Sequence, residues 1–254
     1  MSEGLPDQLW VRPVTGIPEV GEGMAVGELI ADAAGDLATG DVVVISQKIV
    51  SKAEGQVRRL SSVLPSAEAR RLAAVLGKEP NLVELILSES TEVLRAERGV
   101  LIVETHHGFV CANAGIDASN LPEADTVCLL PADPDASARR IRAEIGAASG
   151  IDLAVVVSDS FGRAWRLGQA EVAIGCAGLS PLDDWRGRTD AGGRELEATL
   201  IAVADEAAGA ADLVRDKASG VPAAVVRGLD RYVSAEDGPG AAALRRPREE
   251  DLFR

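Results

Sequence analysis

Two stretches of the sequence end in residues that can handle an anionic ligand. GDVVVISQKIVSKAEG (residues 40–55) runs from an apolar segment into Lys48 and Lys52, and AVVVSDSFGRAWRLGQ (residues 154–169) runs into Asp159 and Ser160. A lysine that follows a strand can hold phosphate as a point charge. A carboxylate beside a hydroxyl suits Mg²⁺ or Mn²⁺, which prefer hard oxygen ligands. Both stretches are therefore candidates for one site that binds phosphate and a divalent cation.

Each stretch also has an ordinary structural interpretation. Lysines four residues apart are commonly a solvated pair on a surface, and Asp159 can simply cap a turn before Gly162. Spacing alone does not separate these interpretations from the functional ones. Spacing favours a solvated surface pair for the two lysines. For Asp159 it favours the capping role and the metal-binding role equally.

A third candidate is the small-residue loop NAGIDASN (residues 113–120). Its glycine permits close approach of the backbone to a ligand, and Asp117 can supply a second carboxylate to a metal site. Considered alone, the loop is more typical of a turn stabilised by Asn and Asp side chains. Asp117 thus joins the candidates only together with the other two stretches.

The remaining candidates are weaker. His106 and His107 are adjacent, so on a strand they would point to opposite faces, and we expect a structural or rim role for them. Trp165 and Arg166 can stack on or clamp an anionic substrate, or can serve only packing and surface charge. The chain has no G-x-x-x-x-G-K-[ST] motif, which excludes a P-loop.

The elements that must position these residues alternate between strands and helices. Continuous apolar runs at residues 42–45, 100–103, 153–157 and 223–226 predict strands that are covered on both faces. We expect a helix from the cap Ser66 through Leu76 with Gly77 as its stop, and a short helix opened by Pro80. Asp135 is expected to cap a helix with one apolar stripe, formed by Ala138, Ile141, Ile145 and Ala148.

One segment has no single interpretation. Residues 192–214 fit one long helical face, but residues 195–203 fit equally well a strand that leads into a helix near Asp205. We expect one domain over residues 1–232. The Gly-, Pro- and charge-rich tail, residues 233–254, is expected to be flexible.

Composition limits the class of protein. The 254 residues are 46% apolar and only 3% aromatic, which favours a mixed α/β (α+β) enzyme over an all-β binding module. A net charge of −14 argues against nucleic acid as a partner, and no apolar run is long enough to span a membrane. Three widely spaced cysteines and no recognisable signal peptide lead us to expect a cytoplasmic protein.

Six segments in order resemble a specific family. TGIPEV, GDVVVISQKIVSKAEG, NAGIDASN, LLPADPDASARRIR, VVVSDSFGRAWRLGQAEVAIGCAGL and VADEAAGAADLV are similar to the coenzyme F420-0:gamma-glutamyl ligase family. The resemblance covers about residues 9–229. It implies a GTP-dependent ligase that adds one or more L-glutamates to coenzyme F420-0, through an acyl phosphate, in coenzyme F420 biosynthesis. It also implies Mg²⁺ or Mn²⁺, about two ions per site, and an intertwined homodimer, and it leaves open a need for K⁺.

The resemblance assigns roles to individual residues. As catalytic residues it implies Asp117, Asp159 and Lys52, with Asp117 and Asp159 holding one metal ion and Ser160 a second. For the nucleotide it implies the residues Ile17, Pro18, Glu19, Val20, Ser46, Gln47, Lys52 and Asn120. Where some relatives have a Met-Gly-Gln-like segment, this chain has Arg215, Asp216 and Lys217, and a direct charge from Lys217 would replace a metal-bridged contact.

Other functions remain open at this stage. One is an amide ligase on the same scaffold with another acceptor, because no side chain here identifies a deazaflavin. Another is a nucleotide-binding regulatory module without ligase activity, and a third is a simple GTP hydrolase. Retention of the two carboxylates, Ser160 and Lys52 argues against a module that only binds.

Overall fold

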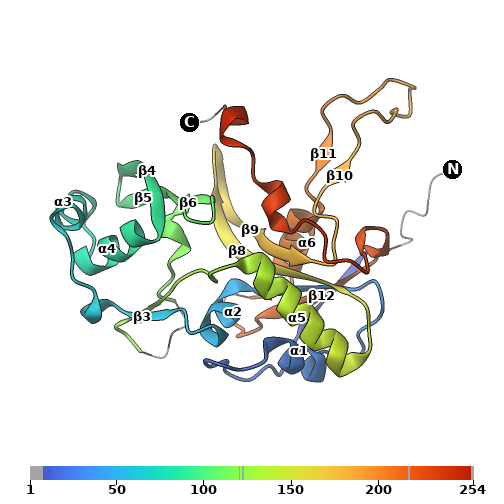
Figure 1. Ribbon diagram of the computed structural model, residues 1–254, viewed down its shortest axis with the longest axis horizontal. Helices are drawn as coiled ribbons and strands as arrows, with labels where there is room; N and C mark the ends of the chain where they lie inside the picture. The colour runs from blue at the N-terminus through green and yellow to red at the C-terminus, as the bar shows by residue number, and fades with distance from the viewer. Residues whose placement is uncertain (1–7, 120, 122, 217, 253–254) are drawn as a thin grey trace.

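The computed structural model describes residues 8–119, 121, 123–216 and 218–252. Its centre is a five-stranded sheet in the order β1–β12–β2–β8–β9 (Figure 1). The strands are β1 (Trp10–Val14), β2 (Val42–Ser46), β8 (Ala154–Arg163), β9 (Arg166–Ala177) and β12 (Ala223–Arg227). β2 and β8 run parallel, and the other neighbouring pairs run antiparallel. The protein is therefore mixed α/β, as the sequence predicts.

Helices cover both faces of this sheet. Val43 and Ile45 of β2 point into the core shared with α1 (Val26–Ala34) and α5 (Pro134–Ser149). Val42 and Val44 point the other way, into a core shared with α6 (Val203–Asp212). Figure 1 shows α5 lying across one face of the sheet. This two-sided burial explains why the central strands are continuously apolar.

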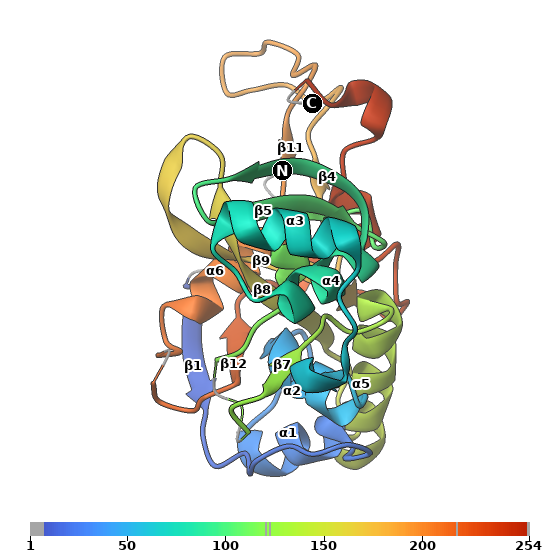
Figure 2. The same ribbon diagram turned by 90° about the vertical axis from the view of Figure 1, so that its left-hand side faces the viewer.

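A smaller unit lies beside the sheet and faces the viewer in Figure 2. It contains the helices α3 (Ala67–Leu76) and α4 (Pro80–Ser88), and the antiparallel strands β4 (Ser90–Glu97), β5 (Val100–Thr105) and β6 (Val110–Ala112). Ser66 accepts a hydrogen bond from the backbone N–H of Ala69 and Gly77 ends α3 in the left-handed conformation, which confirms both predicted helix signals. The helix opened by Pro80 is confirmed as well.

The prediction that all four apolar runs are covered on both faces is wrong for β5. Leu101 and Val103 are buried against α3 and α4, but Val100 is 40% exposed. The three-stranded antiparallel sheet has helices on one face only, so its strands alternate between core and solvent.

The expected cap of α5 is also wrong. Asp133 is the capping residue, because it accepts a hydrogen bond from the backbone N–H of Ala136, and Pro134 occupies the first turn. Asp135 instead accepts hydrogen bonds from the backbone N–H groups of Cys176 and Ala241. The apolar stripe ends at Ile145, since Ala148 is exposed.

Of the two interpretations of residues 192–214, the single long helix is wrong. The residues lead through the short strand β11 (Leu200–Ile201) into α6, which begins at Val203. β11 pairs with β10 (Asp183–Asp184), and the residues between them form the arm that projects in Figure 1. The residues of the arm are exposed except for the half-buried Trp185 and Leu196, so its apolar residues have no core against which a helix could pack.

The polar ends of the two candidate stretches are not turns. β2 passes directly into the helix α2 (Gln47–Ala53), which carries both lysines. β8 continues through Asp159 and Ser160 to Arg163, because it pairs with β9 from Val155 to Arg163, with a register shift after Val157. The site residues of these two stretches are therefore held on a helix and a strand.

The remaining elements connect these units. β3 (Val57–Arg59) pairs with β7 (Thr126–Cys128), and the 3₁₀ turns are η1 (Leu60–Ser62), η2 (Asn113–Gly115), η3 (Asp230–Tyr232), η4 (Ala241–Leu244) and η5 (Arg248–Glu250). In the described chain, no helix combines the length and the apolar character needed to cross a bilayer.

The part of the tail that the structure describes makes contacts with the body. Ala241 is 1% exposed in the core beside α6, and Asp237 pairs with Arg142 of α5 at 2.8 Å. Arg248 forms an ion pair with Glu92 on β4 at 2.8 Å. The flexibility of the tail in solution stays a prediction.

Candidate active site

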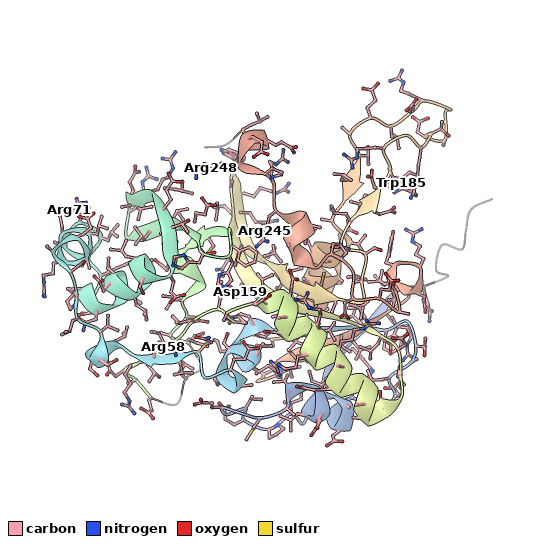
Figure 3. The ribbon with its side chains drawn as sticks, in the orientation of Figure 1. Arg58, Arg71, Asp159, Trp185, Arg245 and Arg248 are labelled. Carbon is pink, nitrogen blue, oxygen red and sulfur yellow. The ribbon has the colours of Figure 1, made fainter. Side chains whose placement is uncertain are left out.

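One cavity of about 340 Å³ lies where β2 ends and passes into α2, beside the part of β8 that extends beyond its parallel pairing with β2. Its walls include most of the residues expected at the nucleotide and metal sites: Ile17, Pro18, Glu19, Val20, Ser46, Gln47, Lys52, Asp117, Asp159 and Ser160. In Figure 3, Asp159 lies near the middle of the molecule, away from the arm that carries Trp185. Asn120 and Lys217, also expected here, lie outside the described residues.

Lys48 and Lys52 lie one turn apart on α2, and both line the cavity. Nζ of Lys52 is 2.6 Å from Oε1 of Glu19, and Nζ of Lys48 is 2.7 Å from Oδ2 of Asp117. Their side chains are only 10% and 15% exposed. The interpretation as a solvated pair is therefore wrong, because both ammonium groups are held against carboxylates at the cavity.

Asp117 combines the two interpretations that the sequence left open. Its carboxylate accepts hydrogen bonds from the backbone N–H and the hydroxyl of Ser119, which is the turn that the loop composition predicts. The same carboxylate lines the cavity and pairs with Lys48. Burial raises the pKa of Asp117, but the hydrogen bonds from Lys48 and Ser119 outweigh burial and bring the pKa below its usual value. Asp117 is thus ionised at neutral pH and can serve as an anionic ligand.

Asp159 and Ser160 line the cavity from neighbouring positions on β8. In the antiparallel ladder Ser160 lies opposite Glu171 of β9, and its hydroxyl donates a hydrogen bond to the Glu171 carboxylate. Asp159 is thus not the cap of a turn, since the strand continues on both sides of it.

Sequence reasoning did not single out Glu171, and it named Arg215 only as part of a segment that departs from some relatives. Glu171 is only 7% exposed, and Arg215 places a guanidinium nitrogen 3.1 Å from Oε2 of Glu171. Both line the cavity. The available signal was a single glutamate within the apolar run of QAEVAIG, because a charged side chain in a buried strand needs a partner.

The residues at the cavity fit a hard divalent cation. Asp117, Asp159 and Ser160 offer only oxygen donors, the type that Mg²⁺ and Mn²⁺ prefer. Within the described parts of the chain, no three His, Cys, Asp or Glu side chains form a metal-binding group. A cation here would therefore rely on one or two carboxylates, with substrate oxygens and water completing its shell, which is the usual mode of Mg²⁺ at phosphates.

The weaker candidates do not line the cavity. His106 and His107 lie in the turn between β5 and β6, where their Nε2 atoms are 2.9 Å from the backbone oxygens of Ser88 and Pro131, which agrees with a structural role. Trp165 is 81% exposed near the tip of the β8–β9 hairpin, beside Arg166. The structure does not bring this pair together with the other candidates.

Buried ammonium groups, carboxylates and a hydroxyl around one cavity at a strand-end edge are typical of an enzyme that transfers phosphoryl or acyl groups. Comparison with known sequences identifies the family within this class. The sequence model of the F420-0:gamma-glutamyl ligase family matches residues 16–228, and the chain belongs to that family.

Three relatives show how far the similarity extends, and each is a coenzyme F420:L-glutamate ligase. The protein from Methanothermobacter thermautotrophicus is 48% identical over 95% of this chain and 97% of its own length. The one from Methanocaldococcus jannaschii is 41% identical over 92% of both chains. The one from Haloarcula marismortui is 46% identical over 96% of this chain and 95% of its own length.

Proposed function

We propose that this protein joins L-glutamate to coenzyme F420-0 through an amide bond, with GTP as the phosphoryl donor and Mg²⁺ or Mn²⁺ as the divalent cation. Family membership and the names of the relatives support the ligase reaction. The observation that supports the nucleotide and metal most strongly is that the described residues expected at both sites line one cavity.

The chemistry explains why a phosphoryl donor is needed. A free carboxylate does not react usefully with an amine, because its oxygen is a poor leaving group. Transfer of the γ-phosphoryl group of GTP to the acceptor carboxylate gives an acyl phosphate and GDP. The amine of L-glutamate then attacks the carbonyl carbon, phosphate departs with the electrons of the C–O bond, and the nitrogen loses a proton. The added glutamate carries a new γ-carboxylate, so further additions are chemically equivalent.

Lys52 is positioned to hold the transferring phosphoryl group. Its ammonium is nearly buried, and interactions between charges are stronger where water is excluded. Glu19, its partner in the structure, has a side chain that is 75% exposed. A phosphate oxygen can therefore replace the Glu19 carboxylate, which turns into solvent at little cost.

Asp117 and Asp159 would hold one divalent cation, and Ser160 would be a ligand of the second. Such cations neutralise the charge that GTP and the two substrates bring into the site. Lys48 and Ser119 keep the carboxylate of Asp117 ionised, as a cation ligand must be. Asn120 and Lys217 complete the proposed nucleotide site, with Lys217 as a direct charge.

The proposal extends to assembly and location. We propose an intertwined homodimer, and light scattering of the purified protein tests it. The exposed Trp165 and Leu167 on the β8–β9 hairpin, at 81% and 97%, support a surface for a second copy. A cytoplasmic location is supported by the three cysteines, which are all free thiols in the structure.

The test is mass spectrometry of coenzyme F420-0 after incubation with the protein, GTP, Mn²⁺ and L-glutamate, with and without K⁺. We expect species heavier by one or more glutamyl units, and none when GTP or the divalent cation is omitted. An unchanged mass with folded protein would contradict the proposal. GTP consumption that still needs glutamate would then indicate another acceptor. GTP consumption without either co-substrate would indicate a hydrolase. GTP binding without consumption would indicate a regulatory module.

A further inference from the structure

A buried carboxylate that the proposed reaction does not yet use lies in the wall of the cavity. Glu171 of β9 is 7% exposed and faces the cavity-lining part of β8. It accepts hydrogen bonds from two serine hydroxyls of β8, Ser158 to Oε2 at 2.6 Å and Ser160 to Oε1. The two oxygens of one carboxylate thus fix two hydroxyls on the neighbouring strand.

The charge of Glu171 is balanced by Arg215. A terminal nitrogen of Arg215 lies 3.1 Å from Oε2 of Glu171 and 3.2 Å from the Ser158 hydroxyl, and both ionic side chains are 6% exposed. Among the described residues, Nε of Arg215 has no hydrogen-bond partner. A buried arginine with an unsatisfied donor is costly, so the arrangement depends on the opposite charge of Glu171.

The two serines differ in one respect that matters for chemistry. Ser160 lines the cavity, whereas Ser158 is fully buried and is not among the residues of its wall. A hydroxyl that donates its hydrogen to a carboxylate turns its lone pairs away from that carboxylate. For Ser160, which lines the cavity, this holds the hydroxyl hydrogen on the side of Glu171, so that the oxygen can act as a cation ligand without first turning the hydroxyl.

We propose that Glu171 is a positioning residue: it fixes the Ser160 hydroxyl as a cation ligand, while Arg215 neutralises its charge. The inference rests on the proposed function for the reaction that this cation serves. It adds a carboxylate and a guanidinium that act through Ser160 and not by contact with the reacting atoms. Carboxylate partners of metal ligands commonly have this effect, and their removal weakens metal binding about 10- to 100-fold.

The test is the affinity for Mn²⁺ in the presence of GDP, measured by electron paramagnetic resonance, with thermal unfolding of the metal-free protein measured in parallel. Glu171→Gln alone leaves Arg215 buried without an anion, so the informative protein is the double variant Glu171→Gln/Arg215→Gln, which removes both charges together. Ser158→Ala is the matched control, because it deletes a hydrogen bond to the same carboxylate without altering the cavity wall. Ser160→Ala removes the proposed ligand itself.

We expect the double variant to unfold cooperatively and to bind the second Mn²⁺ about 10- to 100-fold more weakly. Ser158→Ala should stay within about two-fold of the unmodified protein. Adding Ser160→Ala to the double variant should weaken binding no further than Ser160→Ala does alone, because Glu171 acts through Ser160. A buried ion pair with a purely structural role would not produce this non-additivity.

Unchanged Mn²⁺ affinity of the double variant, or an equal loss in Ser158→Ala, would overturn the inference. Additive losses from Ser160→Ala and the double variant would overturn it as well. Failure of the proposed function gives a different result: the unmodified protein would not add glutamate to F420-0, whatever the order of the Mn²⁺ affinities.

Discussion

Two lysines on one helix illustrate how the site is set at the scale of single residues. Nζ of Lys48 is 2.7 Å from Oδ2 of Asp117 and 2.8 Å from both the backbone oxygen and the hydroxyl oxygen of Ser119. Lys52 meets Glu19, whose side chain is largely exposed and easily displaced. The first lysine therefore maintains the charge of a proposed metal ligand, and the second is the one that we propose contacts an incoming phosphate.

Substitution of Lys52 tests this difference. Lys52→Ala should weaken GTP binding about 100-fold, because removal of one preorganised electrostatic group commonly costs about 3–4 kcal/mol, part of it at the ground state. Glu19→Gln removes the competing anion and should leave the affinity unchanged or improve it. Isothermal titration with GTP measures both. Equal affinity of Lys52→Ala and the unmodified protein would exclude Lys52 from the nucleotide site.

Asp159 provides a second test at this scale. Asp159→Ala should abolish metal-dependent turnover, a loss of at least about 10²-fold, while the circular dichroism spectrum stays native. The control is Asp184→Ala, since Asp184 lies on β10 at the base of the arm and its side chain is 47% exposed. Turnover of Asp159→Ala close to that of the control would remove Asp159 from the site.

Sequence reasoning identified residues whose types carry the chemistry, but not their charge partners. Asp117, Asp159, Ser160 and Lys52 were predicted and meet at one cavity. Their roles stay predictions. The pairing of Glu171 with Arg215 was missed because the two residues are 44 positions apart in the chain, and only the fold brings them within 3.1 Å. Pairing of buried charges is a tertiary property that local spacing does not encode.

At the scale of elements, α1 and α5 must pack closely to hold the sheet that presents the site. A Cβ on Gly27 of α1 would lie 2.5 Å from Cβ of Glu144 and 2.6 Å from the backbone oxygen of Ile141. The backbone N–H of Gly27 also donates to the Glu144 carboxylate at 2.7 Å. The absence of a side chain at Gly27 therefore sets the distance between the two helices.

A pair of glycine substitutions tests this packing. Gly27→Ala should lower the free energy of unfolding by about 1–3 kcal/mol, because the helices must separate. Gly209→Ala in α6 should raise it by about 0.5–1 kcal/mol, since a Cβ there meets nothing within 4 Å and alanine favours a helix. Urea unfolding measures both variants. Stabilisation by Gly27→Ala would contradict the close packing of α1 on α5.

The central strands were predictable because burial on both faces leaves a continuous apolar run, as in β2. Other elements depended on context. The helix α5 is capped by Asp133 and not by the predicted Asp135, because Pro134 occupies the first turn. β8 extends beyond its apolar run because the hairpin with β9 satisfies its backbone even where its side chains are polar.

For the molecule as a whole, three free thiols on different strands, β6, β7 and β9, show by their reactivity whether the protein is folded. Cys111, Cys128 and Cys176 are at most 7% exposed. Burial raises the pKa of Cys111 and of Cys176 to about 12, and it also raises the pKa of Cys128. In the native protein these thiols are therefore both inaccessible and protonated.

A thiol reagent gives the corresponding prediction. At pH 8 the native protein should react slowly or not at all with Ellman's reagent, and the unfolded protein should release three equivalents. Because the native thiols keep their protons where unfolded thiols ionise, stability should fall as the pH rises above about 8.5. Rapid reaction of any native thiol at pH 8 would contradict its burial.

The central claim concerns the whole site: nucleotide and divalent cation meet between α2 and the Asp159–Ser160 part of β8. Its most direct measurement is a crystal structure of the protein with GDP and Mn²⁺, in which anomalous scattering locates the metal. The account predicts a manganese peak beside Asp117 and Asp159, with the GDP phosphates in the same cavity next to Lys52. Manganese and GDP bound elsewhere, with this cavity empty, would contradict it.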